Sequence, residues 1–300
     1  MHDACLSLCR STRCSIEPQT PSHPRPSHAP IALLTDFGER DWYVGALRGV
    51  IQSIAPQAPV LDITHAIAPG DSRAAAFILS QCWLDFPPGT VFCAVVDPGV
   101  GTDRTPVAAH ADERTFVGPD NGLLGFLTQA FDGEAAPRWQ AHAIRNAYLF
   151  RQVVTHTFHG RDLFAPVAAH LAKGTPLEKV GPPHPTLQPP PWSLPTYAPA
   201  LVRGEVLHVD RYGNVLTNLK VAALRQRYTL GNALHLEPAQ TASALFIPLV
   251  DTFGSVPLGE PLAYEGSGGF LEIAVNGASA MRQFHLAPGQ RIDLVDLNPA

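Results

Sequence analysis

The stretch TVFCAVVDPGVGTDR, residues 90–104, combines a strand pattern with a loop that is a candidate for ligand binding. Its first part, residues 90–97, is a near-continuous run of β-branched and other apolar residues, which is typical of a strand buried on both faces of a sheet. The run ends at Asp97 and passes into a loop with one proline and two glycines, residues that allow close backbone approach. Ligands of open α/β sheets bind beyond the carboxyl ends of the strands, so this loop is a candidate site.

Strand and helix patterns alternate around this stretch. Residues 31–36 and 59–64 are short apolar runs typical of strands, whereas residues 41–54 and 71–84 carry apolar side chains at helical spacing. Asp71 is the expected N-cap of the second helix. The alternation predicts an α/β domain with a largely parallel sheet over residues 30–181.

The pattern changes after residue 200. Short runs with period-two alternation, such as FLEIAV at 270–275, are separated by Gly and Pro turns, and they predict a smaller all-β barrel over residues 200–300. Residues 182–199 contain eight prolines and are the expected linker. Residues 1–29 are rich in Pro, Ser, His and Arg without an apolar period, which predicts a disordered extension.

Composition narrows the class of protein. The 300 residues carry a net charge of −5, which argues against nucleic-acid and anionic-membrane partners. No apolar run is long enough to span a bilayer, and the first residues show no secretory signal. The five cysteines suit reduced thiols in a cytoplasmic protein. A metal tract at Cys5, Cys9 and Cys14 is the less favoured alternative.

Several polar residues follow expected strands. Asp36 could accept two hydrogen bonds from a ribose diol, or it could cap a turn. His159 lies in a strand-to-helix turn, where either a functional role or packing is plausible, and His65 is interpreted as structural. A divalent metal on Asp36, Asp97, Asp120 and His159 is conceivable, but no short-range HxH or HxxE spacing supports it.

Seven motifs together resemble one family. They are TDFG with WYVGALRG, DITHAI, VVDPGVGTDR, FVGPDNGLL, TFHGRDLFAPVAAHLA, DRYGNVLTN and GSGGFLEIAVN, spread over about residues 30–297. The chain resembles the S-adenosyl-L-methionine (SAM) hydrolases, or SAM hydroxide adenosyltransferases, whose superfamily includes the SAM-dependent fluorinase and chlorinase. The resemblance implies an α/β domain, a β-barrel and a homotrimer with active sites between subunits.

The resemblance also implies a reaction. Water displaces L-methionine from C5′ of SAM, and adenosine is released. The implied catalytic set is Asp97, Arg104 and His159. Halogenases place Tyr where Asp97 stands and Trp where Gly70 stands, so both positions favour the hydrolase. SAM is then substrate, and neither cofactor nor metal is expected because no phosphoryl or carbonyl oxygen has to be polarised.

Binding residues carry over by position. Asp36 is implied for the ribose diol and Phe158 for the pocket wall. The second domain contributes Asp210 and Asn214 at the methionine end, Tyr212 and Phe253 near adenine, and Ser267 at the methionine carboxylate. Barrel core remains the alternative for Tyr212 and Phe253. The family's NSxG reads Gly266-Ser267-Gly268-Gly269 here, which puts contacts from the missing side chains in doubt.

The expected function is therefore SAM hydrolysis to adenosine and L-methionine. A SAM-dependent halogenase is the alternative enzyme, and a SAM- or adenosine-binding protein with little turnover is the alternative from another class.

Overall fold

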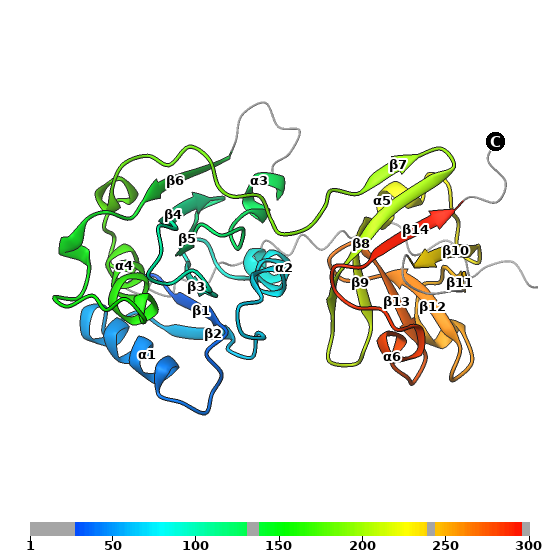
Figure 1. Cartoon of the computed structure of the whole chain (residues 1–300), viewed down its shortest axis with the longest axis horizontal. Helices are drawn as coiled ribbons and strands as arrows, with labels where there is room; N and C mark the ends of the chain where they lie inside the picture. The colour runs from blue at the N-terminus through cyan, green and yellow to red at the C-terminus, as the bar shows by residue number, and fades with distance from the viewer. Residues whose placement is uncertain (1–27, 131–137, 239–243, 296–300) are drawn as a thin grey trace, which may run out of the picture.

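The structure is a computed structural model that describes residues 28–130, 138–238 and 244–295. Two domains follow one another along the chain and are joined by an extended segment (Figure 1). The expected extension at 1–29, with its three cysteines, lies outside the described residues except for residues 28 and 29. No helix within the described ranges combines the length and apolar character needed to cross a membrane.

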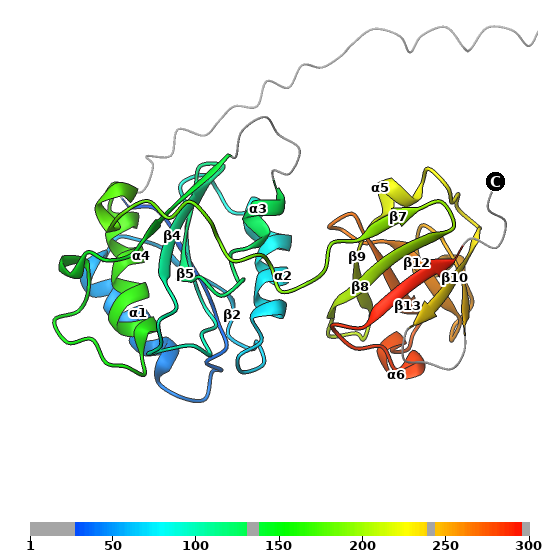
Figure 2. The same ribbon diagram turned by 45° about the horizontal axis from the view of Figure 1, so that its top comes forward.

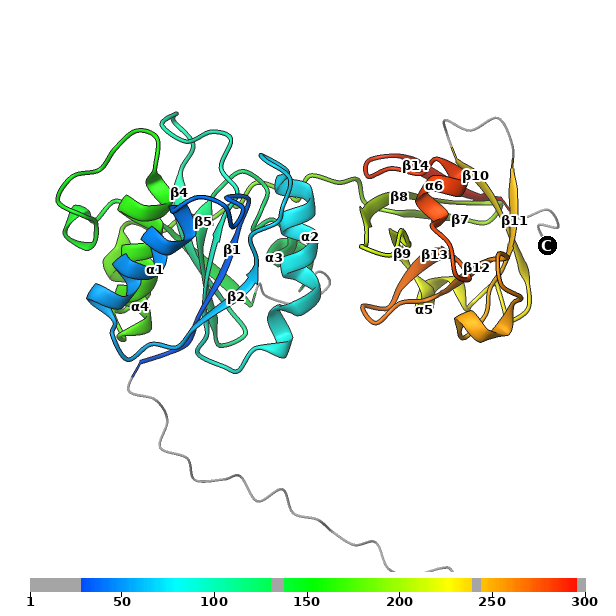
Figure 3. The same ribbon diagram turned by 90° about the horizontal axis from the view of Figure 1, so that it is seen from below.

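The N-terminal domain has three layers. Its sheet runs in the order β2 (Val60–Thr64), β1 (Ile31–Thr35), β3 (Val91–Val95), β5 (Arg114–Pro119), β4 (Pro106–Ala111), β6 (Trp139–Ala143). Helices α1 (Tyr43–Ile54) and α4 (Ala165–Ala172) cover one face, and α2 (Ser72–Cys82) and α3 (Phe126–Ala130) cover the other (Figure 3).

Burial on both faces explains the apolar runs. Along β1, Ile31 and Leu33 belong to the core beneath α1 and α4, whereas Ala32 and Leu34 belong to the core beneath α2. Strand β3 is buried throughout, as the sequence predicts. The N-cap prediction is also confirmed, because the Asp71 side chain accepts a hydrogen bond from the Ala74 N–H at 2.9 Å.

The sheet is mixed, and the prediction of a largely parallel sheet is confirmed in part. Strands β1, β2, β3 and β5 pair in parallel, but β4 is antiparallel to β5 and β6. The two-residue connection at Asp112 and Glu113, both with positive φ, forms a tight hairpin. A parallel pair requires a crossover of a dozen residues or more, so this turn leaves only the antiparallel arrangement.

The C-terminal domain is a barrel-like antiparallel sheet (Figure 2). Its order is β11 (Leu245–Pro248), β10 (Ala233–Pro238), β14 (Arg291–Val295), β8 (Leu201–Val209), β9 (Val215–Lys220), β13 (Phe270–Val275), β12 (Pro261–Glu265). A bridge between Leu249 and Ala263 links the two ends of this order. The short helices α5 (Val221–Leu224) and α6 (Ala280–Phe284) complete the domain.

The proline-rich segment packs along both domains. Its Trp192 donates to the Gln129 side chain at 3.2 Å, and its strand β7 (Thr196–Ala198) pairs with β8. Arg73 of α2 forms an ion pair with Glu205 of β8. The two domains therefore contact each other directly as well as through the connection.

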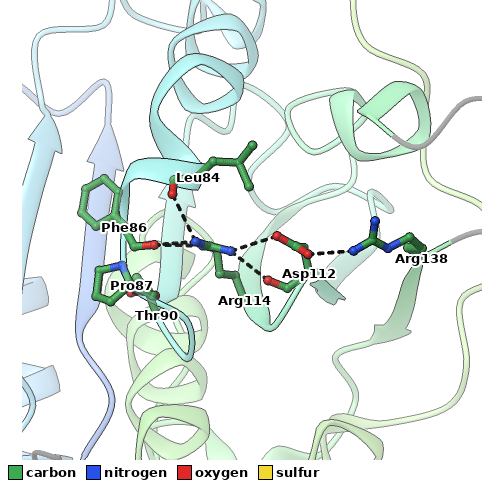
Figure 4. Close-up of polar contacts among 7 residues, drawn as sticks. All are labelled: Leu84, Phe86, Pro87, Thr90, Asp112, Arg114 and Arg138. Atoms are coloured by element: carbon green, nitrogen blue, oxygen red, sulfur yellow. Dashed lines mark hydrogen bonds and ion pairs between the residues drawn. The ribbon is translucent and has the colours of Figure 1, made fainter. Parts of the chain in front are cut away.

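One buried arginine fastens the end of α2 to the β4–β5 hairpin (Figure 4). Arg114 donates to the carbonyl oxygens of Leu84, Phe86 and Asp112, and to the Asp112 carboxylate at 3.1 Å. Arg138 binds the other oxygen of that carboxylate at 2.9 Å. Four of the five hydrogen bonds that Arg114 donates end on backbone carbonyl oxygens, which indicates a structural role for this arginine.

Candidate active site

A cavity of about 420 Å³ opens at the carboxyl edge of the N-terminal sheet. Asp36 follows β1, Asp97 follows β3, and His159 immediately precedes a π-helical turn over Gly160–Phe164 that leads into α4. Such turns are frequent at functional sites. The cavity is lined by four of the predicted residues, Asp36, Asp97, Phe158 and His159.

The three predicted catalytic residues form a chain of hydrogen bonds. Arg104 Nε lies 2.9 and 3.0 Å from the two carboxylate oxygens of Asp97, and its Nη2 also contacts that carboxylate. The same Nη2 lies 2.7 Å from His159 Nδ1. Arg104 is absent from the cavity lining, so it lies behind Asp97 and His159 and fixes one relative to the other.

The charge state of His159 follows from this contact. An arginine only donates, so Nδ1 must accept and the proton of the neutral ring lies on Nε2. Burial, reinforced by the neighbouring Arg104 charge, lowers the pKa of His159 below its ordinary value of 6.5. The ring is neutral at neutral pH, with Nε2–H as its remaining donor.

A glycine allows the Asp97 loop to reach the His159 segment. Gly101 has a φ of +80°, and a Cβ there would lie 2.7 Å from the backbone oxygen of His156. Any side chain would separate the two loops. Asp97 and His159, which lie far apart in the sequence, are adjacent because of this backbone contact.

Asp162 holds the second loop in place. Its fully buried carboxylate accepts from Thr155 N at 2.9 Å, from Thr155 Oγ1 at 2.7 Å, and from Arg161 and Arg151. Burial alone raises the pKa of Asp162, but the bonds from Arg161 and Thr155 outweigh it and lower the pKa to about 2. The anchored segment carries Phe158 and His159.

Aromatic rings form one wall of the cavity. The ring of Phe158 packs edge to face against Tyr43 at 5.2 Å and against Phe37 at 5.8 Å. Tyr43 and Phe37 line the cavity and were missed as site residues by sequence reasoning. Phe37 lies directly after the first strand and Tyr43 at the start of the next helix, and these positions were the available signal.

Asp36 caps a turn, which is one of its two sequence interpretations, and its role toward a ribose diol stays a prediction. Its Oδ2 accepts from the Gly70 N–H at 2.8 Å, which ties the loop after β1 to the loop after β2. Asp36 also lines the cavity. The carboxylate therefore caps a turn and still faces the space where a ligand would lie.

The C-terminal domain has a second cavity of about 650 Å³. Asp210 organises its rim, because its carboxylate accepts from the backbone N–H groups of Tyr212 and Asn214 and from the Asn214 side chain, at 2.8–2.9 Å. Tyr212 is 79% exposed and Phe253 is partly exposed, so the alternative that both are barrel core is wrong. All four residues line this cavity.

The predicted site is thus divided within one chain. No described residue lines both the cavity at Asp97 and the cavity at Asp210. Ser267 lies in neither lining; it occupies the turn between β12 and β13, next to Gly268, which lines a third cavity between the domains. No group of three or more potential metal ligands occurs within residues 28–130, 138–238 and 244–295.

Comparisons with known proteins agree on one family. Residues 31–181 match the model of the SAM hydroxide adenosyltransferase N-terminal domain, and residues 204–293 match that of the C-terminal domain. A Thermus thermophilus protein named (R)-S-adenosyl-L-methionine hydrolase is 42% identical over 274 residues, 89% of this chain and 99% of the relative. A crystal structure of an uncharacterized conserved protein from Thermotoga maritima superposes with a TM-score of 0.81 at 37% identity, covering 89% of this chain and all of that one. A Nocardia brasiliensis fluorinase is more distant, at 28% identity over 86% of this chain and 94% of its own length.

Proposed function

The chain belongs to the SAM hydroxide adenosyltransferase family, and from this we infer that it hydrolyses S-adenosyl-L-methionine to adenosine and L-methionine. The observation that carries the inference is the Asp97–Arg104–His159 chain of hydrogen bonds, whose two ends line the N-terminal cavity. These residues are the ones that the hydrolase resemblance implies.

The chemistry needs a better nucleophile more than a better leaving group. As the water oxygen bonds to C5′, the C5′–S bond breaks and its electron pair returns to sulfur, so methionine leaves as a neutral thioether. Asp97 accepts the proton that the water loses. Both of its oxygens are held by Arg104, yet a carboxylate has about four acceptor positions and retains room for a water.

His159 acts as a donor in this arrangement. Its Nδ1 is occupied by Arg104, so Nε2–H holds the attacking water by the lone pair that does not attack C5′. Holding the nucleophile in line with C5′ is a proximity effect, which supplies a large part of the rate enhancement in such reactions. Asp97 is the base, and His159 is the orienting group.

The remaining predicted residues bind the substrate. Asp36 holds the ribose diol and Phe158 packs against the nucleoside. Asp210, Asn214, Tyr212, Phe253 and Ser267 hold the other parts of SAM from the second domain. The family resemblance implies a homotrimer in which the N-terminal cavity of one subunit faces the C-terminal cavity of its neighbour. The absence of a described residue common to both linings fits that arrangement.

The setting of the reaction is inferred with it. The enzyme works in the cytoplasm, which suits the free, unpaired Cys82 and Cys93 thiols, whose pKa values burial raises to about 11 and about 12. SAM is its small-molecule partner, and it needs no cofactor or metal. The domains divide at 30–181 and 200–300, with 182–199 as the linker.

Product analysis in H₂¹⁸O tests the function. The label should enter the 5′-hydroxyl of adenosine, because water oxygen attacks carbon there, and adenosine should remain the sole nucleoside product in high chloride. Chlorinated deoxyadenosine that increases with chloride would identify a halogenase. Unchanged SAM bound to the protein would identify a binding protein.

A further inference from the structure

A polar relay whose inner end is buried lies beneath the loop that carries Asp36. It consists of Arg48, Asp62, His65 and Thr35 and ends on the backbone N–H of Phe37. His65 Nε2 lies 3.1 Å from Asp62 Oδ1, and His65 Nδ1 lies 2.8 Å from Thr35 Oγ1. Arg48 binds the other Asp62 oxygen, and Phe37 N lies 3.2 Å from Thr35 Oγ1.

Both ends of the relay fix the position of every proton in it. The Asp62 carboxylate only accepts, so His65 Nε2 carries the ring proton and donates it. Nδ1 is then an acceptor, and the Thr35 hydroxyl donates to it. The Phe37 N–H only donates, and Thr35 Oγ1 accepts it on a lone pair. The three hydrogen bonds from Phe37 to Asp62 therefore point the same way, and Arg48 donates to Asp62 from the other side.

Burial makes this arrangement rigid. Thr35 is fully buried and His65 is 3% exposed, so water does not compete for their hydrogen bonds. Burial lowers the pKa of His65, and the Arg48 charge adds to this, so the imidazole stays neutral. The outer end, Asp62 and Arg48, is partly exposed and paired as ions.

Two residues of the relay are the sequence neighbours of Asp36. Thr35 precedes it and Phe37 follows it, and both are held by the relay. His65 also accepts from the Gly38 N–H through its own backbone oxygen at 2.8 Å. With the Gly70 N–H on Asp36 Oδ2, the loop is fastened on both sides of the carboxylate to the segment after β2.

We propose that His65 is a positioning residue that, through Thr35, orients the Asp36 carboxylate toward the ribose diol of the substrate. The proposal rests on the proposed function, because it requires a nucleoside in the cavity at Asp36. His65 touches neither substrate nor reacting atoms. Its effect should therefore appear in binding of the diol and be absent for ligands that lack one.

Calorimetric binding of adenosine and of 2′,3′-dideoxyadenosine to the full-length protein tests this role. His65→Leu fills the same space without polar atoms and should raise the Kd for adenosine about tenfold while changing that for the dideoxy compound less than twofold. Thr35→Val should do the same, and Thr35→Ser, which keeps the hydroxyl, should bind like the parent. If His65→Leu does not fold, the comparison of Thr35→Val with Thr35→Ser tests the proposal in its place.

The chain supplies a matched control. His110 Nδ1 lies 3.2 Å from Thr115 Oγ1 on the β4–β5 pair, away from the cavity. His110→Leu removes the same kind of contact and should change neither Kd. Equal weakening of both ligands in His65→Leu and Thr35→Val would show a merely structural role and overturn the proposal, as would unchanged binding. Absence of adenosine binding by the parent protein would overturn the proposed function and the role of the relay with it.

Discussion

Two buried arginines of the N-terminal domain are each paired with an aspartate, yet they use their remaining donors differently. Arg114 directs its donors to backbone carbonyl oxygens and to Asp112 (Figure 4). Arg104 directs its donors to two side chains, Asp97 and His159, and both of these face a cavity. The difference separates an arginine that closes a fold from one that prepares two groups for a ligand.

Burial and charge alone do not distinguish a structural arginine from one that serves a ligand site, but the hydrogen-bond partners do. The side chains of Arg104 and Arg114 are 10% and 8% exposed, so desolvation is similar for both. What differs is the kind of partner. Arg104 donates to two ionisable side chains that line one cavity, whereas four of the five hydrogen bonds of Arg114 end on backbone carbonyl oxygens.

The largest effect should come from the carboxylates of the two pairs. Asp97→Asn keeps the shape but removes the proton acceptor, so kcat should fall about a thousandfold while SAM affinity changes little. Asp112→Asn, the matched change in the other pair, should leave kcat within twofold. Steady-state kinetics with SAM measure both. A parent-like rate for Asp97→Asn would mean that the two pairs are equivalent and that Asp97 is structural.

Substitutions of Arg104 and Arg114 should have the next largest effects, one on kcat and the other on stability. Arg104→Lys keeps the charge but loses the fork that holds Asp97 and His159 together, and kcat should drop about a hundredfold with little change in stability. Arg114→Lys should lower the free energy of unfolding by about 3 kcal/mol, because buried carbonyl groups lose their donors. Its kcat per folded molecule should be unchanged. Urea denaturation and steady-state kinetics on the same samples measure both effects. A loss of stability in Arg104→Lys together with a loss of kcat in Arg114→Lys would contradict the distinction between the two arginines.

A fully buried aspartate, Asp162, sharpens the comparison through pH. The pKa of Asp162 is about 2 in the folded protein, against an ordinary value of 3.8, so its charge stabilises the fold above pH 3.8. That contribution, about 2 kcal/mol, is lost as the pH falls from 3.8 to 2. Asp162→Asn should remove this part of the pH dependence of unfolding. An identical acid limb in the parent and the variant would show that other carboxylates control it.

The smallest effect concerns the protonation of His159. Since burial and Arg104 lower its pKa below 6.5, the neutral ring is present at neutral pH and is lost only on acidification. The kcat/KM profile for SAM should therefore be flat through pH 7 and decline with a midpoint below 6.5. In Arg104→Lys, the midpoint of the remaining activity should move. An acid limb centred above 6.5 would contradict a lowered pKa for His159, and activity that falls as the pH rises through this range would place the imidazolium in the working enzyme.

The periodic spacing of apolar residues in the sequence was enough to predict individual helices and strands. Alternating apolar runs fixed α1, α2 and the doubly buried β3, because a strand covered on both faces has no polar positions and a helix has them at a period of 3.6. The sequence also determined the family, through motifs at strand ends. The prediction of a largely parallel sheet was confirmed only for β2, β1, β3 and β5, because the two-residue turn at Asp112 and Glu113 was not interpreted as a hairpin.

Contacts between residues that are distant in the sequence became known only from the folded structure. Arg104 and His159 are 55 residues apart, and their contact depends on Gly101 packing against a backbone oxygen that no local pattern reveals. The same holds for His65, which was interpreted as structural and which, 30 residues from Thr35, fastens the loop that carries Asp36. Sequence patterns record which face of an element is buried, whereas hydrogen-bond partners between loops depend on distances that exist only after the elements have packed.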